Sequence, residues 1–312
     1  MINDEMQHET RKQRTRGVGS PRARVGRWLA RSGALAAVLS SSVARAQLAD
    51  SVAAMSVEQY PGAESDGAAG ETNLRVLRTS VGAPLLLSEA TTLVVGAAYE
   101  RLDIHTGAGE ELELHAPKAL LGGVQRLSER WGVMAFTEIG LASSLDGSLG
   151  SDDLLLSLTG IATYAVSDSF QLGAGIIYDR RSGELAPMPA LTLRLRLSER
   201  LRVRGFAPVW LRAEYRATPW LDVGVRSSFE SNRFHFADGA PQDRNAELAY
   251  SNLTVGPQLT INFTDWTHLD LYAAGAVYRR YELFDDDERF AREGLSPVVG
   301  YGARLWIAPS CW

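Results

Sequence analysis

Apolar and polar residues alternate with a period of two along most of the chain from about residue 72 onward. In the segment 191–197, every second residue is a leucine, and Thr192, Arg194 and Arg196 lie between them. Because successive side chains of a β-strand point to opposite faces, each such segment has one apolar and one polar face. No stretch after residue 46 has the spacing of an amphipathic helix. The pattern therefore predicts an all-β protein.

The alternation predicts a series of strands that runs nearly to the end of the chain. The predicted strands after residue 72 are 72–86, 91–103, 112–127, 131–144, 153–166, 170–180, 188–197, 201–206, 209–217, 220–231, 247–261, 268–282 and 296–307. A further strand at about 51–60 makes the total fourteen. Single-chain bacterial barrels have an even number of strands, so twelve is the alternative if 51–60 and 201–206 are not strands.

The connections between these strands are of two alternating kinds. Short turns begin with a serine or threonine, as at Ser128, Ser198 and Thr264, whose hydroxyl can bond the backbone of a tight turn. Longer polar connections fall near 103–111, 145–152, 180–187, 231–246 and 284–295, and only the connection near 205–208 is short. Tight turns on one side and long loops on the other are typical of transmembrane β-barrels.

Aromatic residues support a membrane location. Trp131, Phe170, Trp220 and Trp266 each follow a short turn, where a barrel carries its interfacial girdle. We therefore predict an antiparallel up-and-down transmembrane β-barrel of 12–14 strands. The residues expected to face lipid in the central strands are Leu191, Leu193, Leu195, Val209, Leu211, Leu221, Val223 and Val225. The alternative is an exported soluble β-protein, a sandwich or propeller, in which they would pack into a core.

The first 46 residues differ from the rest and have the features of a secretory signal. They contain nine Lys or Arg residues and three acids, and a mostly apolar stretch from Gly33 to Val43 follows the basic part. The small-x-small sequence Ala44-Arg45-Ala46 completes the pattern that signal peptidase recognises. We predict a signal peptide over 1–46, a barrel domain over 47–312, and export to the outer membrane of a Gram-negative bacterium.

The exported chain is expected to begin near Gln47, directly after this cleavage site. Mass spectrometry of the protein isolated from outer membranes tests the position. A membrane-bound chain that retains residues 20–40 would contradict it.

Charge and composition exclude several classes of protein. Removal of residues 1–46 takes away nine of 32 basic and three of 37 acidic residues, which leaves a net charge of −11, the wrong sign for nucleic-acid binding. A single cysteine, Cys311, cannot form a disulfide framework or a cysteine metal site within one chain. No run of about 18 apolar residues occurs, so a polytopic helical membrane protein is excluded.

Three stretches of the sequence are similar to a family of bacterial outer-membrane β-barrel proteins known only as a domain of unknown function (series 6268). They are SVEQYP at 56–61, TTLVVGAAYERL at 91–102, and PMPAL at 187–191 leading to LSERL at 197–201. The resemblance covers about residues 50–307. It implies a barrel fold, and it assigns no activity and no functional residues.

Candidates for catalysis and metal binding are weak. His235 lies at the outer end of a predicted strand, close in sequence to Glu230, Ser231 and Asn232, but a nucleophile–base pair needs a geometry that sequence does not define. The acidic run 285–288 lacks the glycine and the alternating spacing of an EF-hand loop. We expect no catalytic residues, no cofactor and no metal.

A cluster of charged residues on the polar face of segments 188–231 is more informative. The predicted lumen-facing basic wall consists of Arg194, Arg196, Arg202, Arg204, Arg212, Arg216 and Arg226, and the predicted lumen acids are Glu214, Asp222 and Glu230. An arginine that faces lipid at mid-membrane costs about 2–4 kcal/mol, so these side chains should point inward. They would either favour anions in a narrow channel or form a network that packs the lumen. The second interpretation is slightly favoured.

The sequence thus predicts a monomeric, non-enzymatic outer-membrane barrel with a structural or narrow pore-like role. Its expected partners are outer-membrane lipids, the barrel-assembly machinery during insertion, and small solutes. The alternatives are a barrel enzyme that acts on lipid or lipopolysaccharide, and the exported soluble β-protein.

Overall fold

The structure is a computed structural model that describes residues 52–64, 71–105, 111–145, 149–151, 153–179, 187–236, 246–285 and 288–307. The expected signal peptide over 1–46 lies outside the described residues. Within those ranges, no helix is long and apolar enough to cross a membrane.

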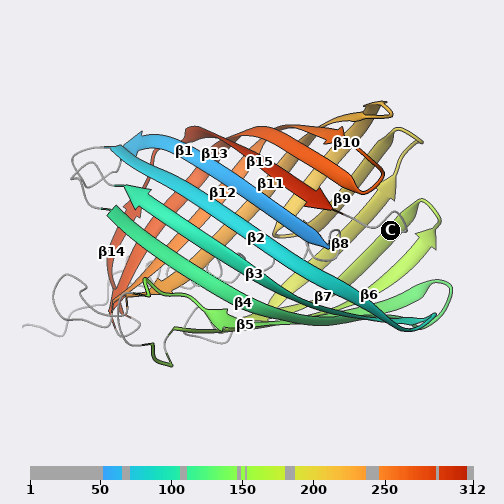
Figure 1. Cartoon of the computed structure of the whole chain (residues 1–312), viewed down its shortest axis with the longest axis horizontal. Helices are drawn as coiled ribbons and strands as arrows, with labels where there is room; N and C mark the ends of the chain where they lie inside the picture. The colour runs from blue at the N-terminus through green and yellow to red at the C-terminus, as the bar shows by residue number, and fades with distance from the viewer. Residues whose placement is uncertain are drawn as a thin grey trace, which may run out of the picture.

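All elements of the described chain are strands, and neighbouring strands pair antiparallel (Figure 1). They are β1 (Ala53–Glu64), β2 (Glu71–Ser88), β3 (Thr91–His105), β4 (Glu111–Arg126), β5 (Trp131–Leu141), β6 (Leu154–Ser167), β7 (Phe170–Asp179), β8 (Met188–Arg196), β9 (Leu201–Ala207), β10 (Trp210–Thr218), β11 (Leu221–His235), β12 (Ala246–Asn262), β13 (Thr267–Asp285), β14 (Glu288–Gly294) and β15 (Val298–Ile307).

The sheet closes into a barrel with fourteen strand positions. Each of the strands β2 to β14 pairs with the strand before it, and β15 pairs with both β13 and β1. β14 pairs with the outer end of β13, from Arg280↔Gly294, whereas β15 pairs with the rest of it, from Thr267↔Ile307. β14 and β15 are therefore two parts of one strand position. The predicted strands at 51–60 and 201–206 are both confirmed, and the sandwich and propeller alternatives are excluded.

The tight turns lie at one end of the barrel, on the right in Figure 1. The hydroxyl of Ser128 accepts hydrogen bonds from the backbone N–H groups of Arg130 and Trp131 at 3.3 and 3.1 Å. The hydroxyls of Ser198 and Thr264 make the same pair of contacts in their own turns. This is the turn chemistry expected from the sequence, and it satisfies backbone donors that strand pairing leaves free.

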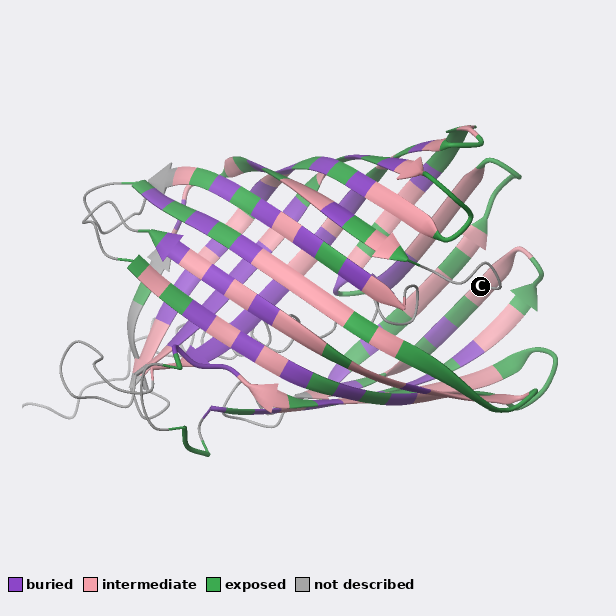
Figure 2. Ribbon diagram, viewed as in Figure 1, coloured by how far each residue is buried: buried purple, intermediate pink, exposed green. Residues whose placement is uncertain are grey.

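Exposed and buried residues alternate along the strands, as the coloured bands in Figure 2 show. A single-layer barrel has only one interior, so its buried side chains point into the lumen and its exposed apolar side chains point outward. Trp131, Trp220 and Trp266 are exposed next to tight turns, and Phe170 is half-buried. The exterior is therefore apolar, with aromatic residues near the tight-turn end.

Seven of the eight residues expected to face lipid are exposed or half-buried, and Val209 is not. The seven are Leu191, Leu193, Leu195, Leu211, Leu221, Val223 and Val225. Val209 is 0% exposed and packs against interior residues such as Phe206, so its expected outward orientation is wrong. The physical reason is that Val209 belongs to the turn between β9 and β10 and not to β10, so the strand alternation begins only at Trp210.

The barrel narrows toward the end that carries the long loops. Two residues beyond the end of β5, Ser143 forms an isolated bridge with His115 of β4 on one side and with His235 of β11 on the other. Backbone hydrogen bonds of 2.8 and 3.0 Å join Ser143 to His115, and the N–H of His235 donates to the carbonyl of Ala142 at 3.0 Å. Next to Ser143 the neighbouring strand is therefore β11, whereas β6 is the neighbour of β5 along Trp131–Leu141. Strands β7 to β10, which include the short β8, β9 and β10, contribute none of the described core residues at this end.

Apolar side chains fill the interior of this narrow outer half. They come from β1 to β4, β6 and β11 to β13, together with Ala142 and Leu295. Tyr250, Phe234 and Leu74 are among its largest fully buried members. The outer half of the barrel therefore has a packed hydrophobic core.

Candidate functional site in the barrel lumen

An ion-pair network crosses the lumen on the side of the hydrophobic core that faces the tight turns. Arg78 of β2 forms an ion pair with Glu230 of β11, and its guanidinium also lies 3.4 Å from Glu58 of β1 and 3.9 Å from Glu100 of β3. Lys118 of β4 lies 3.4 Å from the other oxygen of Glu100. Because β11 lies across the lumen from β2, these contacts join opposite walls.

Glu58 is the centre of this network. Its carboxylate accepts hydrogen bonds from the hydroxyls of Tyr60 at 2.9 Å and Tyr272 at 2.6 Å. Arg226 of β11 lies 3.7 Å from the same carboxylate and 3.9 Å from the centre of the Tyr272 ring. Buried charges are stable only when they are paired and hydrogen-bonded, and this cluster meets both conditions. We call Glu58, Arg78, Glu100, Lys118, Arg226, Glu230 and Tyr272 the cross-lumen network.

A second ion-pair group lies on the short strands and contains much of the predicted basic wall. Arg202 contacts Glu214 at 2.9 Å and Asp222 at 2.7 Å. Arg204 contacts Glu214 at 3.1 Å, and Arg216 contacts Asp222 at 3.4 Å. The structure therefore brings two of the three predicted acids together with three of the seven predicted arginines.

The other predicted wall residues have different surroundings. Arg212 contacts Asp270 of β13 at 3.5 Å, and Asp270 also accepts a hydrogen bond from Thr260 at 2.8 Å. Arg226 and Glu230 belong to the cross-lumen network. Arg194 and Arg196 are exposed on β8, and neither has a carboxylate within ion-pair distance among the residues that the structure describes.

The sequence pattern did not single out Asp270 or most of the cross-lumen network. The alternating pattern does place Glu58, Arg78 and Glu100 on the polar faces of their strands. Nothing in the local pattern indicated that they meet, because 152 positions separate Arg78 from Glu230.

His235 is not brought together with the polar residues near it in sequence. Its Nδ1 lies 3.0 Å from Oδ1 of the fully buried Asp153, and Glu230 is paired with Arg78 instead. Ser231 forms a hydrogen bond with Ser251 at 3.0 Å. His235 therefore helps to hold the narrow outer end closed. No group of three or more potential metal ligands occurs in the described part of the chain, and residues 286 and 287 of the acidic run lie outside it.

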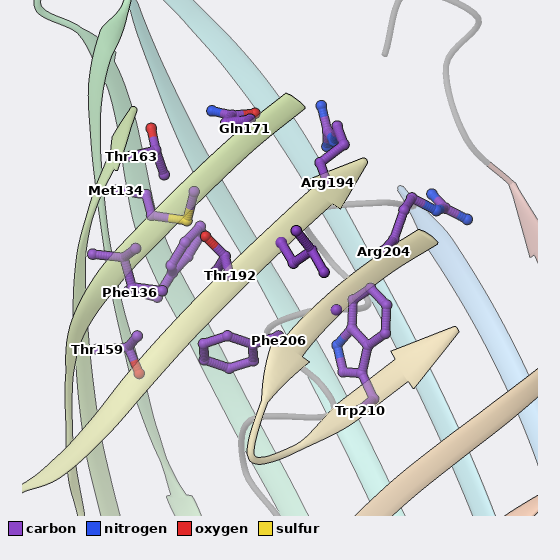
Figure 3. A pocket seen from close by; sticks show the side chains of 13 residues that line it. Met134, Phe136, Thr159, Thr163, Gln171, Thr192, Arg194, Arg204, Phe206 and Trp210 are labelled. Atoms are coloured by element: carbon purple, nitrogen blue, oxygen red, sulfur yellow. The ribbon is translucent and has the colours of Figure 1, made fainter. Parts of the chain in front are cut away.

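A cavity of about 120 Å³ lies on the inner side of β5 to β10 (Figure 3). Aromatic and apolar side chains form much of its lining, including Phe136, Phe206 and Trp210. Figure 3 shows Arg194 and Gln171 at one end, and Phe206 with Trp210 at the other. The first end lies toward the tight turns, since β8 runs from Met188 to Arg196 and a tight turn follows. The sequence pattern gave no indication of this cavity.

The cavity lining includes the hydroxyl oxygen of Thr159 on β6 and the indole nitrogen of Trp210 on β10, and neither atom has a hydrogen-bond partner among the described residues. The shape of this region also depends on Gly173 of β7, because a Cβ there would lie 2.2 Å from the hydroxyl oxygen of Thr192. The absence of a side chain at Gly173 leaves room for Thr192 on the neighbouring strand.

Comparison with known sequences identifies one family. A family described as "Domain of unknown function (DUF6268)" matches residues 43–289. No curated protein matches the chain.

Solved structures of outer-membrane proteins are similar to this fold at low identity. The toluene transporter TodX from Pseudomonas putida is 12% identical with a TM-score of 0.40, over 81% of this chain and 88% of that one. The translocator domain of the autotransporter NalP from Neisseria meningitidis is 11% identical with a TM-score of 0.39, over 93% and 96%. LpxR from Salmonella typhimurium is 7% identical with a TM-score of 0.35, over 81% and 99%. At these values the similarity says nothing about ligand or activity.

Proposed function

The chain belongs to the family of the domain of unknown function DUF6268, which assigns no activity, and we propose from the barrel itself that it is a monomeric, non-enzymatic β-barrel of the bacterial outer membrane with a structural role. In this proposal a cleavable signal peptide directs export, the tight turns face the periplasm, and the long loops face outward.

The outer surface supports the membrane location. Large apolar side chains are exposed on strands around the barrel, for example Val81, Leu121 and Val299. A contiguous apolar surface of this kind would be an aggregation hazard in water, whereas lipid covers it. Exposed tryptophans near the tight turns suit a membrane–water interface.

The cross-lumen network is the observation that supports a closed barrel. Arg78 and Glu230 are attached to opposite walls, and the hydrophobic core fills the lumen beyond them. A conducting path would have to separate buried charges from their partners, which costs several kcal/mol per broken pair. The arginines of the short strands are likewise mostly neutralised by Glu214, Asp222 and Asp270.

Recordings in planar lipid bilayers test this proposal against the narrow anion channel. We expect no stable conductance from the wild type. The variant Arg212→Glu should lower the unfolding temperature, because it places a second carboxylate next to the buried Asp270, and it should leave the membrane non-conducting.

Arg196→Glu is the matched control, because Arg196 is exposed and has no carboxylate partner within the described ranges. It should change the unfolding temperature little. A steady anion-selective current in the wild type, with a reversal potential that moves toward cation preference in either variant, would contradict the closed barrel and support the channel.

A further inference from the structure

The cavity between β5 and β10 has two chemically different ends. One end is apolar and aromatic, formed by side chains that include Phe206, Trp210 and Ile161. The other carries the guanidinium groups of Arg194 and Arg204 (Figure 3). A volume of about 120 Å³ suits the body of one ring or a short branched chain. The shape and the lining therefore match a small molecule with an apolar body and a polar head.

The charge at the polar end specifies the sign of that head. Arg204 already has an acid partner, because Glu214 contacts both Arg204 and Arg202, and Arg202 also contacts Asp222. Arg194 adds a positive charge that no carboxylate of the described residues balances. Guanidinium groups bind carboxylates through paired N–H donors, and they repel cations. The cavity therefore favours an anion.

The unpartnered polar atoms are a separate observation that points to a ligand. Thr159 is only 4% exposed, and its hydroxyl has no hydrogen-bond partner among the described residues. The same holds for the N–H of Trp210, a donor that belongs to an otherwise apolar ring. Buried polar groups of folded proteins are normally satisfied, and a polar ligand in this cavity would supply these two groups with a partner.

We propose that this cavity binds a small amphipathic carboxylate, with its ring or short aliphatic body between Phe206 and Trp210 and its carboxylate toward Arg194. The molecule enters from the tight-turn end, where Arg194 lies. The site needs no open path through the outer half of the barrel, so it does not depend on whether the barrel conducts.

Equilibrium dialysis on purified, folded protein in detergent tests the proposal, with benzoate as the probe. Acetate supplies the charge without the ring, and toluene supplies the ring without the charge. Saturable binding of benzoate is expected, with acetate and toluene at least about ten-fold weaker. Empty detergent micelles correct for partition, and the mobility shift of unboiled samples in gels shows that each variant is folded.

Two variants locate the site, and one serves as the matched control. Arg194→Gln should weaken benzoate binding about ten-fold or more, because it removes a charge-assisted hydrogen bond. Trp210→Phe keeps an aromatic ring and removes the N–H donor, and it should weaken binding about three-fold. Arg196→Gln, on the same face of β8 but outside the cavity lining, should leave binding unchanged.

Three results would overturn the proposal. The first is the absence of saturable benzoate binding by folded protein. The second is equal binding of toluene and benzoate, which would make the cavity a purely apolar site. The third is an equal loss of binding in Arg194→Gln and Arg196→Gln, which would indicate diffuse attraction by the arginines and no defined site.

Discussion

Replacement of Arg78 by leucine is expected to lower the free energy of unfolding by about 3–5 kcal/mol, the usual cost of leaving a buried charge without its partner. The Arg78 side chain is 12% exposed and contacts Glu58, Glu100 and Glu230. Arg226 and Lys118 remain near Glu58 and Glu100 in the variant, but Glu230 loses the cation with which it forms its ion pair. Urea unfolding in detergent, followed by gel mobility, measures the change.

The double variant Arg78→Leu/Glu230→Leu separates the lost ion pair from a simple packing defect. It should recover part of the stability, because removal of both charges leaves no unpaired ion in the lumen. Arg75→Leu, an exposed position three residues earlier on β2, is the control and should have little effect. If Arg78→Leu unfolds at the same urea concentration as Arg75→Leu, the network does not hold the walls together.

Substitution of Val225 by arginine should destabilise the inserted barrel by about 2–4 kcal/mol, as for an arginine at the bilayer midplane. Val225 is 54% exposed on the outside of β11. It lies four residues beyond Leu221, the first residue of that strand. At about 3.3 Å per residue and a tilt of about 40°, this places it about 10 Å beyond the turn, close to the centre of an apolar band about 25 Å tall.

Leu221→Arg is the depth control, because Leu221 is on the same face of the same strand but next to the tight turn. Its cost should fall to about 0–1 kcal/mol, the range for an arginine near the membrane interface. Unfolding from lipid vesicles gives both values. Equal costs at the two positions would show that the exterior of β11 is not in contact with the hydrocarbon core.

The strands could be predicted from the sequence because their cause is local. The predicted strand at 201–206 corresponds to β9, Leu201–Ala207. Its polar and apolar residues already alternate, and Ser198 already provides the hydroxyl that completes the preceding turn. Val209 shows the limit of such reasoning. Periodicity alone does not reveal that a residue lies in a two-residue turn, where the alternation is interrupted.

The candidate site depended on contacts that no local pattern encodes. Alternation placed Arg202, Arg204 and Glu214 on one face, and they meet because neighbouring hairpin strands pair in sequence order. The cavity near Thr159 and Trp210 was not foreseen, because it depends on how six strands curve around it and on the missing side chain at Gly173.

The sequence by itself determined most of the strands, their inward and outward faces and the tight turns, since each follows from residues that are close along the chain. It left twelve or fourteen strands open, and it predicted a loop at 284–295, where the structure has β14. Only the tertiary structure decided that Ser143 joins β5 to β11, and that Arg78 meets Glu230 across the lumen. A period of two specifies which face a side chain occupies, but not its height relative to strands on the opposite wall. That height is set by the closure of the whole barrel, through the stagger and tilt that all fourteen strand positions share.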